Sequence, residues 1–391
     1  MTDTFIRKRI MFYVQHLLGI GHLARALRLT RHLQQAGMDV TIVSGGMPHP
    51  FADLHGENLV QLAPVRAADV EFSRLLDASG NVIDDNWRAG RKSALLQAFV
   101  DCAPDALIVE MFPFGRRQFS FELLPLLQAA KARQPAPLIL CSVRDIVIPS
   151  AKAGRTQEAI ARAKDYFDHI LVHGDANFLT IEENYPAALD LADKVFYTGY
   201  VTADTDHADH SLAGKDEVTI SAGGGVAGEA LLQTAMRARA LSTQAGKKRW
   251  RILVGASAPQ GQLQSLCDAA PSGVIVEPAR ADFPQMLFNC ACSVSQAGYN
   301  TVMDILRAKA VSATPAVIVP FAAAREREQT VRAQALARSG LATVLPETLL
   351  TPASLAAAID QAMTQKSLPA RIPDMNGGVA AARFIQERLN G

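Results

Sequence analysis

The chain has 391 residues, of which 49% are hydrophobic and 20% are charged, and this apolar content excludes an intrinsically disordered protein. Lysine and arginine number 39 and aspartate and glutamate 38, so the net charge of +1 lacks the basic excess typical of a nucleic-acid-binding protein. At roughly 100–200 residues per domain, the length favours two domains.

The N-terminus enters a strand-like segment directly, with no apolar core or cleavage site of a signal peptide. No stretch reaches the ~18 consecutive apolar residues of a membrane span. The cysteines number five, an odd count, and Cys290 and Cys292 would point to opposite faces of a strand. We therefore expect reduced, buried cysteines in a cytoplasmic protein with no transmembrane segment.

The first half of the chain alternates short apolar runs with longer amphipathic ones. Strands are predicted at Arg9–Gln15, Val40–Val43, Leu59–Leu62, Ala106–Glu110, Leu138–Val143, Ile170–His173 and Val195–Tyr197. A helix is predicted over Gly21–Ala36, because Leu23, Leu27 and Leu33 share one helical face. This alternation of strands and helices predicts a largely parallel sheet with helices on both faces.

Residues 203–216 contain almost no large apolar side chain, which indicates a linker between domains. A second series of strands follows at Val218–Ser221, Arg251–Val254, Val274–Val276, Cys292–Ser295, Ala316–Val319 and Ala342–Leu345, with helices starting near Pro259, Asp282, Gly298, Arg325 and Pro352. The α/β pattern therefore predicts doubly wound domains over residues 1–202 and 217–375, with a terminal helix within 376–391.

The first glycine turn, Gly19–Ala24, follows the first strand and matches the dinucleotide pattern G-x-G-x-x-A. An NAD site also needs an acidic residue at the end of the second strand, which here reads Val43–Gly46, so the sequence argues against NAD. His22 lies in the first helical turn, where the helix dipole keeps an imidazole neutral. It is a candidate base, or alternatively a residue that caps or packs at the turn.

Three segments of the second domain follow strands, where the ligand sites of α/β proteins gather, and the first two of them suit phosphate groups. The first is a glycine loop, the second begins a helix, and the third is a charged helix start after Ala316–Val319 that would otherwise be a solvated face. Their residues are Ser221 with Gly223, Gly224 and Gly225; Ser295, Gly298, Tyr299, Asn300 and Thr301; and Glu328 with Gln329. Asp304 lies one turn along the second helix, where its carboxylate can accept hydrogen bonds from ribose hydroxyls. Glycine backbones and helix N-termini bind phosphates, so this arrangement favours a nucleoside diphosphate.

Together these segments resemble the GT-B glycosyltransferases, specifically the family of the peptidoglycan N-acetylglucosaminyl transferase that uses UDP-GlcNAc, with its family 28 type of C-terminal domain. The motif S-x-x-G-x-x-T-x-x-[ED] appears as Ser295, Gly298, Thr301 and Asp304, the segment P…[ED]-Q as Pro320, Glu328 and Gln329, and the loop G-x-G-G-H in part as Gly19, Gly21 and His22. The resemblance implies two Rossmann-like domains that face each other across a cleft, with the C-terminal helix crossing back toward the first domain.

The resemblance also implies roles for individual residues. The donor-binding set is Gly21, Ser221, Gly223, Gly224, Gly225, Arg280, Ser295, Gly298, Tyr299, Asn300, Thr301, Asp304, Glu328 and Gln329. Within it, the glycines and the 298–301 helix start would hold the diphosphate, Asp304 the ribose, and Glu328 with Gln329 the sugar. The backbone near Arg280 would read the uracil edge. Arg332 departs from the family, which has asparagine after the glutamine.

Catalysis requires a base for the acceptor proton. His22 and Glu110 are the candidates, and Glu110 would otherwise orient His22 or be an ordinary carboxylate at a strand end. The expected acceptor contacts are Arg116, Arg117, Arg144 and Asp145. The sequence contains no His/Cys cluster that demands a metal, so we expect no metal and no cofactor besides the UDP-sugar cosubstrate. Inversion at the sugar is implied by the resemblance.

We therefore expect a glycosyltransferase that moves a hexose-type sugar from a UDP-sugar to an acceptor hydroxyl. The acceptor is a small molecule, a saccharide or a lipid-linked molecule, and the expectation includes peripheral membrane contact but no nucleic acid. One alternative is a UDP-sugar 2-epimerase or nucleotide-sugar hydrolase on the same fold. A second is a non-catalytic protein that binds nucleotide sugars.

Overall fold

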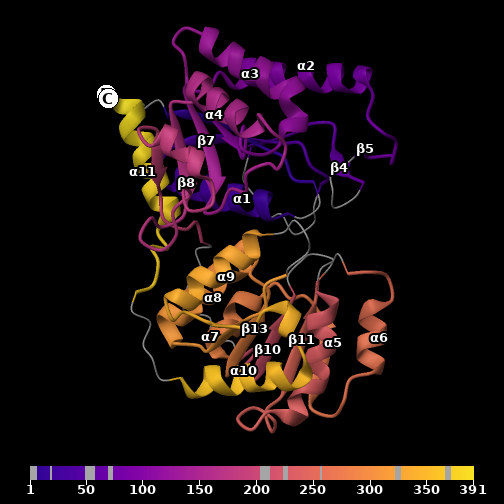
Figure 1. Ribbon diagram of the computed structural model, residues 1–391. Coiled ribbons are helices and arrows are strands. Elements are labelled where there is room, and N and C mark those ends of the chain that lie inside the picture. The colour runs from indigo at the N-terminus through magenta and orange to yellow at the C-terminus, as the bar shows by residue number, and fades with distance from the viewer. Residues whose placement is uncertain are drawn as a thin grey trace, which may run out of the picture. The chain divides into compact units, whose positions relative to one another are not determined.

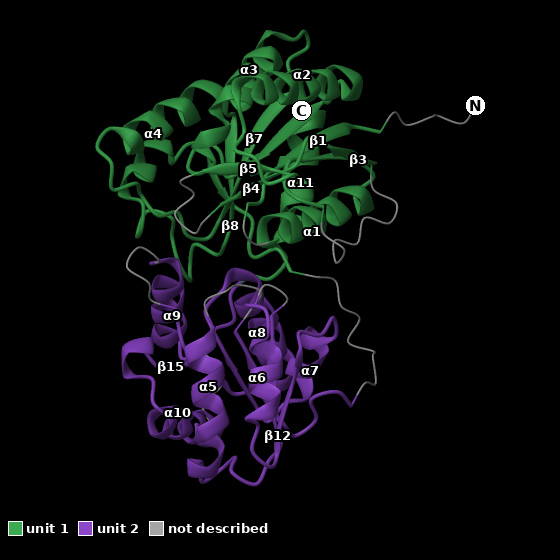
Figure 2. Ribbon diagram, turned by 90° about the vertical axis from the view of Figure 1, so that its right-hand side faces the viewer, with its two compact units in different colours: residues 1–203, 374–391 green, residues 204–373 purple. Residues whose placement is uncertain are grey.

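The structure, a computed structural model, describes residues 7–17, 20–48, 58–68, 74–202, 212–222, 228–255, 258–321, 327–365 and 371–391. The chain divides into two compact units (Figure 2). The first comprises residues 1–203 and 374–391, and the second comprises residues 204–373. The first unit is therefore assembled from two separate stretches of the sequence.

The first unit contains a seven-stranded sheet in which all neighbouring strands are parallel (Figure 1). In spatial order the strands are β3 (Asn58–Gln61), β2 (Asp39–Ser44), β1 (Arg9–Val14), β6 (Ala106–Glu110), β7 (Leu138–Arg144), β8 (His169–His173) and β9 (Val195–Tyr197). The strand order reverses between β1 and β6. At such a switch point a crevice forms outside the carboxyl ends of the strands, and α/β proteins bind ligands in this crevice.

Helices cover both faces of this sheet. They are α1 (Gly21–Gln35), α2 (Asp85–Cys102), α3 (Ser120–Ala132), α4 (Arg155–Tyr166) and α11 (Gly377–Asn390). Tyr13 of β1 enters the core beneath α2, α3 and α4, whereas its neighbour Phe12 enters the core beneath α1 and α11. Burial on both faces explains why β1 reads as an unbroken apolar run.

The second unit contains a six-stranded parallel sheet. In spatial order its strands are β12 (Val274–Pro278), β11 (Trp250–Val254), β10 (Val218–Ser221), β13 (Cys292–Ser295), β14 (Ala316–Ile318) and β15 (Thr343–Val344). Its helices are α5 (Glu229–Ala238), α6 (Gln262–Asp268), α7 (Phe283–Asn289), α8 (Tyr299–Ser312), α9 (Glu328–Arg338) and α10 (Pro352–Thr364). One core lies beneath α5, α6 and α10, and the strand order reverses between β10 and β13.

The predicted α/β class with parallel sheets is confirmed. The antiparallel pair β4 (Val65–Ala67) and β5 (Leu75–Asp77) was not predicted. Arg325 and residues 203–211 of the expected linker lie outside the described residues, and the described part of α9 begins at Glu328. The expectation of buried cysteines is wrong for Cys267, which is exposed on the short helix α6 while its neighbour Leu266 is buried, and Cys102 is only half-buried.

Two further features of the described part of the chain concern membranes and metal ions. None of its helices is both long and apolar enough to span a membrane. Within those same residues, no three histidine, cysteine, aspartate or glutamate side chains gather closely enough to hold a metal ion.

The C-terminal helix α11 packs against α1 of the first unit (Figure 1). Its first turn approaches the segment after β9 closely, and the Gly377 N–H donates to the Tyr200 carbonyl over 3.0 Å. A Cβ atom on Gly377 would lie 2.3 Å from the Gly199 carbonyl oxygen. This approach of backbone to backbone requires glycine at position 377.

Replacing Gly377 with alanine should therefore lower the free energy of unfolding by about 1–3 kcal/mol, the usual cost of overpacking. The matched control is Gly90→Ala in α2, where an added Cβ meets nothing within 4 Å. The control should be neutral or stabilising by about 0.5–1 kcal/mol, because alanine favours the helix. Urea unfolding followed by circular dichroism measures both, and equal midpoints for the two variants would contradict the packing argument.

Candidate active site

The first candidate site lies at the switch point of the first sheet. His22 is in the first turn of α1, directly after β1, and Glu110 is the last residue of the adjacent strand β6. The Nδ1 atom of His22 lies 2.8 Å from Oε1 of Glu110. The imidazole is 13% exposed and the carboxylate is fully buried, so His22 is the member of the pair that a ligand can reach.

Three side chains surround the carboxylate of Glu110. Arg25 of α1 donates to Oε1 as His22 does, and the Ser142 hydroxyl donates to Oε2 over 2.6 Å. Burial alone would raise the pKa of Glu110, but the charge of Arg25 and the hydrogen bonds from His22 and Ser142 outweigh it and lower the pKa to about 2. Glu110 is therefore ionised at neutral pH.

The imidazole of His22 is kept neutral. Burial lowers its pKa most, the positive charge of Arg116 lowers it further, and the opposing effect of Glu110 leaves the pKa at about 3. An ionised carboxylate accepts hydrogen bonds and cannot donate them, so the proton of the neutral ring belongs on Nδ1. The Nε2 atom then carries the lone pair, which is the state that a general base needs.

The four residues expected to contact the acceptor occupy different surroundings. The positive charges of Arg116 and Arg144 both lower the pKa of His22, and Arg116 also donates to the Gln15 carbonyl over 2.7 Å. Burial and the nearby Arg144 lower the pKa of Arg116 to about 10, so it remains a cation. Arg117 points instead toward α4, where it lies 4.0 Å from Glu158.

Asp145, the fourth of these residues, lies inside the first unit. Its side chain is fully buried, and the Tyr200 hydroxyl donates to it over 3.4 Å. This position beneath the surface distinguishes Asp145 from Arg116 and Arg144, which are partly exposed.

The second candidate site lies at the switch point of the second sheet. Ser221 ends β10, Ser295 ends β13, and the two serines are paired in register. The glycines of the following loop, residues 223–225, and Gly19 of the first unit lie outside the described residues. Gly21 is described and begins α1. The two strand ends bring the predicted segments around residues 221 and 295 to one edge of the sheet.

The helix α8 begins at this edge. Gly298 precedes it in an extended conformation, and Tyr299, Asn300 and Thr301 form its first turn. Gly298 has no side chain with which to cap the helix start, and the first turn contains no acidic residue, so its N–H groups suit an anion. Asp304 lies one turn further along and is buried.

The start of α9 is joined to the start of α8. The Gln329 amide oxygen accepts from the Ala297 N–H over 2.9 Å and from the Phe321 N–H over 3.1 Å. Arg332, which is fully buried, donates to the Ala297 carbonyl over 2.7 Å and to Glu328 over 2.9 Å. Gln329 and Arg332 therefore fix the backbone before α8.

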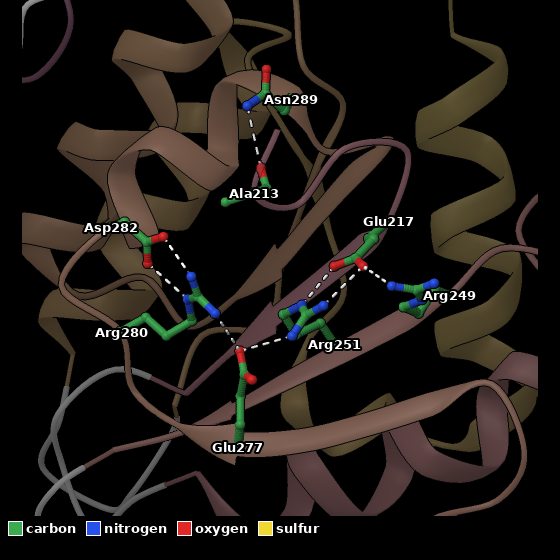
Figure 3. A network of polar contacts seen from close by, with 8 residues as sticks. All are labelled: Ala213, Glu217, Arg249, Arg251, Glu277, Arg280, Asp282 and Asn289. Carbon is green, nitrogen blue, oxygen red and sulfur yellow. Dashed lines mark hydrogen bonds and ion pairs between the residues drawn. The ribbon is translucent and has the colours of Figure 1, made fainter. Parts of the chain in front are cut away.

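Arg280 belongs to a chain of ion pairs across the second sheet (Figure 3). Its guanidinium pairs with Asp282 over 2.6 Å and with Glu277 over 3.4 Å. Glu277 also pairs with Arg251, which in turn binds Glu217 over 2.6 Å. These contacts occupy the Arg280 side chain, so the neighbouring backbone is the better candidate for contacting a nucleobase.

We did not predict from the sequence that Arg25 and Ser142 contact Glu110, or that Arg332 is buried. A signal was present for Arg25, because it lies three residues after His22 on the largely apolar face of α1. For Ser142 there was none, since it contacts Glu110 through the pairing of β6 with β7, and strand order is not visible in one sequence.

Known proteins similar to this chain are glycosyltransferases. Residues 220–387 match the glycosyltransferase family 28 C-terminal domain. The chain is 26% identical over 366 residues to the UDP-N-acetylglucosamine–N-acetylmuramyl-(pentapeptide) pyrophosphoryl-undecaprenol N-acetylglucosamine transferase of Mesorhizobium japonicum. This alignment covers 92% of this chain and 87% of that protein. A protein of the same name from Symbiobacterium thermophilum is 34% identical over 127 residues, 32% of this chain and 33% of that protein.

Solved structures share the fold. The crystal structure of CalG4, the calicheamicin glycosyltransferase, superposes with a TM-score of 0.63 and 14% identity, covering 98% of this chain and 97% of that one. The crystal structure of MurG from Acinetobacter baumannii superposes with a TM-score of 0.58 and 16% identity, covering 97% and 99%. At such identities the likeness shows the fold alone.

The two doubly wound units and these relatives define a glycosyltransferase of the GT-B fold. Within that class, the chain is similar to the peptidoglycan N-acetylglucosaminyl transferases and carries a family 28 C-terminal domain over residues 220–387. The resemblance read from the sequence is confirmed.

Proposed function

We propose that this glycosyltransferase moves a hexose-type sugar from a UDP-sugar resembling UDP-GlcNAc to an acceptor hydroxyl. The observation that carries the proposal is the neutral imidazole of His22 held by the ionised, buried Glu110 at a sheet switch point. The names of the curated relatives give UDP-N-acetylglucosamine as a precedent for the donor and a pyrophosphoryl-undecaprenol molecule as a precedent for the acceptor.

In the proposed reaction His22 is the base and Glu110 is its positioning residue. The acceptor oxygen forms a bond to the anomeric carbon while the bond from that carbon to the phosphate oxygen breaks. The acceptor proton passes to Nε2 of His22, and UDP leaves with the electron pair. Glu110 is fully buried and bound by Arg25 and Ser142, which makes it unsuited to form a glycosyl-enzyme. The proposed reaction is therefore a single displacement, which would invert the anomeric centre.

The donor role falls to the second unit. The N–H groups at the start of α8 meet the diphosphate together with the 223–225 loop, Asp304 accepts from the ribose, and Glu328 and Gln329 contact the sugar. The helix end stabilises the charge that develops on the leaving diphosphate, so the reaction needs no metal ion. Arg116 and Arg144 favour an anionic acceptor, such as a lipid-linked diphosphate reached from the cytoplasm by peripheral membrane contact.

The purified chain tests the proposal directly. UDP-sugars should raise its melting temperature, because they bind the folded state. Incubation with UDP-GlcNAc and a set of acceptors, analysed by mass spectrometry, should show sugar transfer that persists in excess EDTA. Binding of a UDP-sugar that is instead converted without any acceptor would favour the epimerase or hydrolase alternative. Binding with no turnover would favour the non-catalytic one, and no thermal shift with any nucleotide sugar would contradict all three.

A further inference from the structure

A buried chain of hydrogen bonds continues from Glu110 into the first unit. The Ser142 hydroxyl on β7 lies 2.6 Å from Oε2 of Glu110 and 3.0 Å from Nε2 of His173, the last residue of β8. Nδ1 of His173 lies 3.0 Å from the hydroxyl of Thr198, which follows β9. The side chains of Glu110, Ser142, His173 and Thr198 are all buried. Three neighbouring strands therefore place this chain behind His22.

The hydrogen bonds of this chain have one consistent direction. The ionised Glu110 can only accept, so Ser142 donates its single proton to it. The oxygen of Ser142 is then the acceptor for His173, which must carry its proton on Nε2. Nδ1 of His173 then carries the lone pair and lies 3.0 Å from the Thr198 hydroxyl, which also lies 2.7 Å from the Gly199 carbonyl oxygen and 3.3 Å from the Val172 carbonyl oxygen. The direction of the hydrogen bond between Ser142 and His173 thus depends on the tautomer of His173.

His173 is kept in a neutral form by its surroundings. Burial lowers its pKa most, and the charge of Arg25 lowers it further, to about 3. A protonated His173 would carry a proton on both ring nitrogens. The neutral ring has one, and the contact with Ser142 places it on Nε2.

We propose that Ser142 and His173 are positioning residues for catalysis, which act through Glu110 to fix the proton of His22 on Nδ1. Ser142 occupies Oε2, so that Oε1 faces His22 and Arg25. His173 keeps Ser142 donating toward Glu110 and not away from it. The inference rests on the proposed role of His22 as the base, and neither Ser142 nor His173 needs to touch a substrate.

Nuclear magnetic resonance of the protein labelled with ¹⁵N-histidine tests the tautomers in the unaltered protein. We expect His22 with its proton on Nδ1 and His173 with its proton on Nε2, assigned by comparison with His22→Gln and His173→Gln. The opposite tautomer of His173 would overturn the proposal. This measurement needs no substrate, so it decides the tautomers even if the chain transfers no sugar from UDP-GlcNAc, a result that would count against the proposed function alone.

Steady-state kinetics test the consequence. Ser142→Ala and His173→Leu should lower kcat about 10- to 100-fold, as when the partner that orients a functional histidine is removed, while leaving the KM for the donor unchanged. Ser142→Thr and His173→Gln keep the required hydrogen-bond donor and should restore most of the rate. A merely structural role would not follow the hydroxyl or the N–H in this way.

The matched control is Ser293→Ala. Ser293 is also a buried strand serine but lies in the second unit, where its hydroxyl bonds to none of the described residues. Its kcat should stay at the level of the unaltered protein. An unchanged kcat for Ser142→Ala and His173→Leu, with His22 still protonated on Nδ1, would overturn the proposal. Should either of these variants fail to fold, the tautomers of the unaltered protein still decide.

Discussion

Replacing His22 with alanine is expected to lower the turnover number for sugar transfer about 10²- to 10⁴-fold, the usual contribution of a positioned general base. The affinity for the UDP-sugar should change little, because all residues assigned to the donor except Gly21 are in the second unit. The physical reason is the state of the imidazole, which is neutral, partly exposed and held through Nδ1 by Glu110. Single-turnover kinetics with a saturating donor measure the chemical step directly.

The matched control is His169→Ala, since His169 begins the strand β8 at the end opposite to His173. It should transfer sugar at the rate of the unaltered protein. Glu110→Gln should fall close to His22→Ala, because a neutral amide can donate to Nδ1 and favour the wrong tautomer. If His22→Ala retained full turnover, His22 would not be the base.

The second large effect is a loss of stability in mild acid. His22 and His173 have pKa values of about 3 in the folded protein, against about 6.5 in the unfolded chain. Their contribution is therefore complete above pH 6.5 and is lost as the pH falls toward 3, because the unfolded chain takes up protons first. The free energy of unfolding should fall by about 1.4 kcal/mol per pH unit for each histidine, or roughly 2–3 kcal/mol each by pH 4.5.

Urea unfolding at a series of pH values between 8 and 4.5 measures this slope. Glu110 does not add to it in this range, since a carboxylate with a pKa lowered to about 2 loses its stabilising effect below pH 4.5. His22→Gln and His173→Gln should each make the slope shallower by about 1.4 kcal/mol per pH unit, and should leave it unchanged between pH 7 and 8. A slope in His173→Gln as steep as in the unaltered protein would refute the buried, neutral state of that ring.

Much of the fold was predictable because its strands are apolar runs between amphipathic helices. The position of His22 after the first strand and of Glu110 at the end of a later strand was also visible in the sequence. Their contact was not, because it depends on β1 lying beside β6. The same dependence on strand order hid Ser142 and His173, which reach Glu110 across β7 and β8.

Other features could not be predicted because local sequence patterns are ambiguous. Asp145 reads as a polar residue after a strand, yet it is fully buried beside Tyr200, whose position no local pattern indicates. Arg332 reads as a solvated helix residue, yet its guanidinium is buried beneath the start of α8. In both cases a tertiary contact supplies the hydrogen bonds that a buried polar group requires.

The helix α11 has a consequence for the order in which the protein is made. Its buried face completes the core beneath β1, although it is separated from the rest of the first unit by the entire second unit. During synthesis the second unit, encoded without interruption by residues 204–373, is fully available before α11 leaves the ribosome. The unit that is translated first is therefore completed last, in contrast to the usual order from the N-terminus.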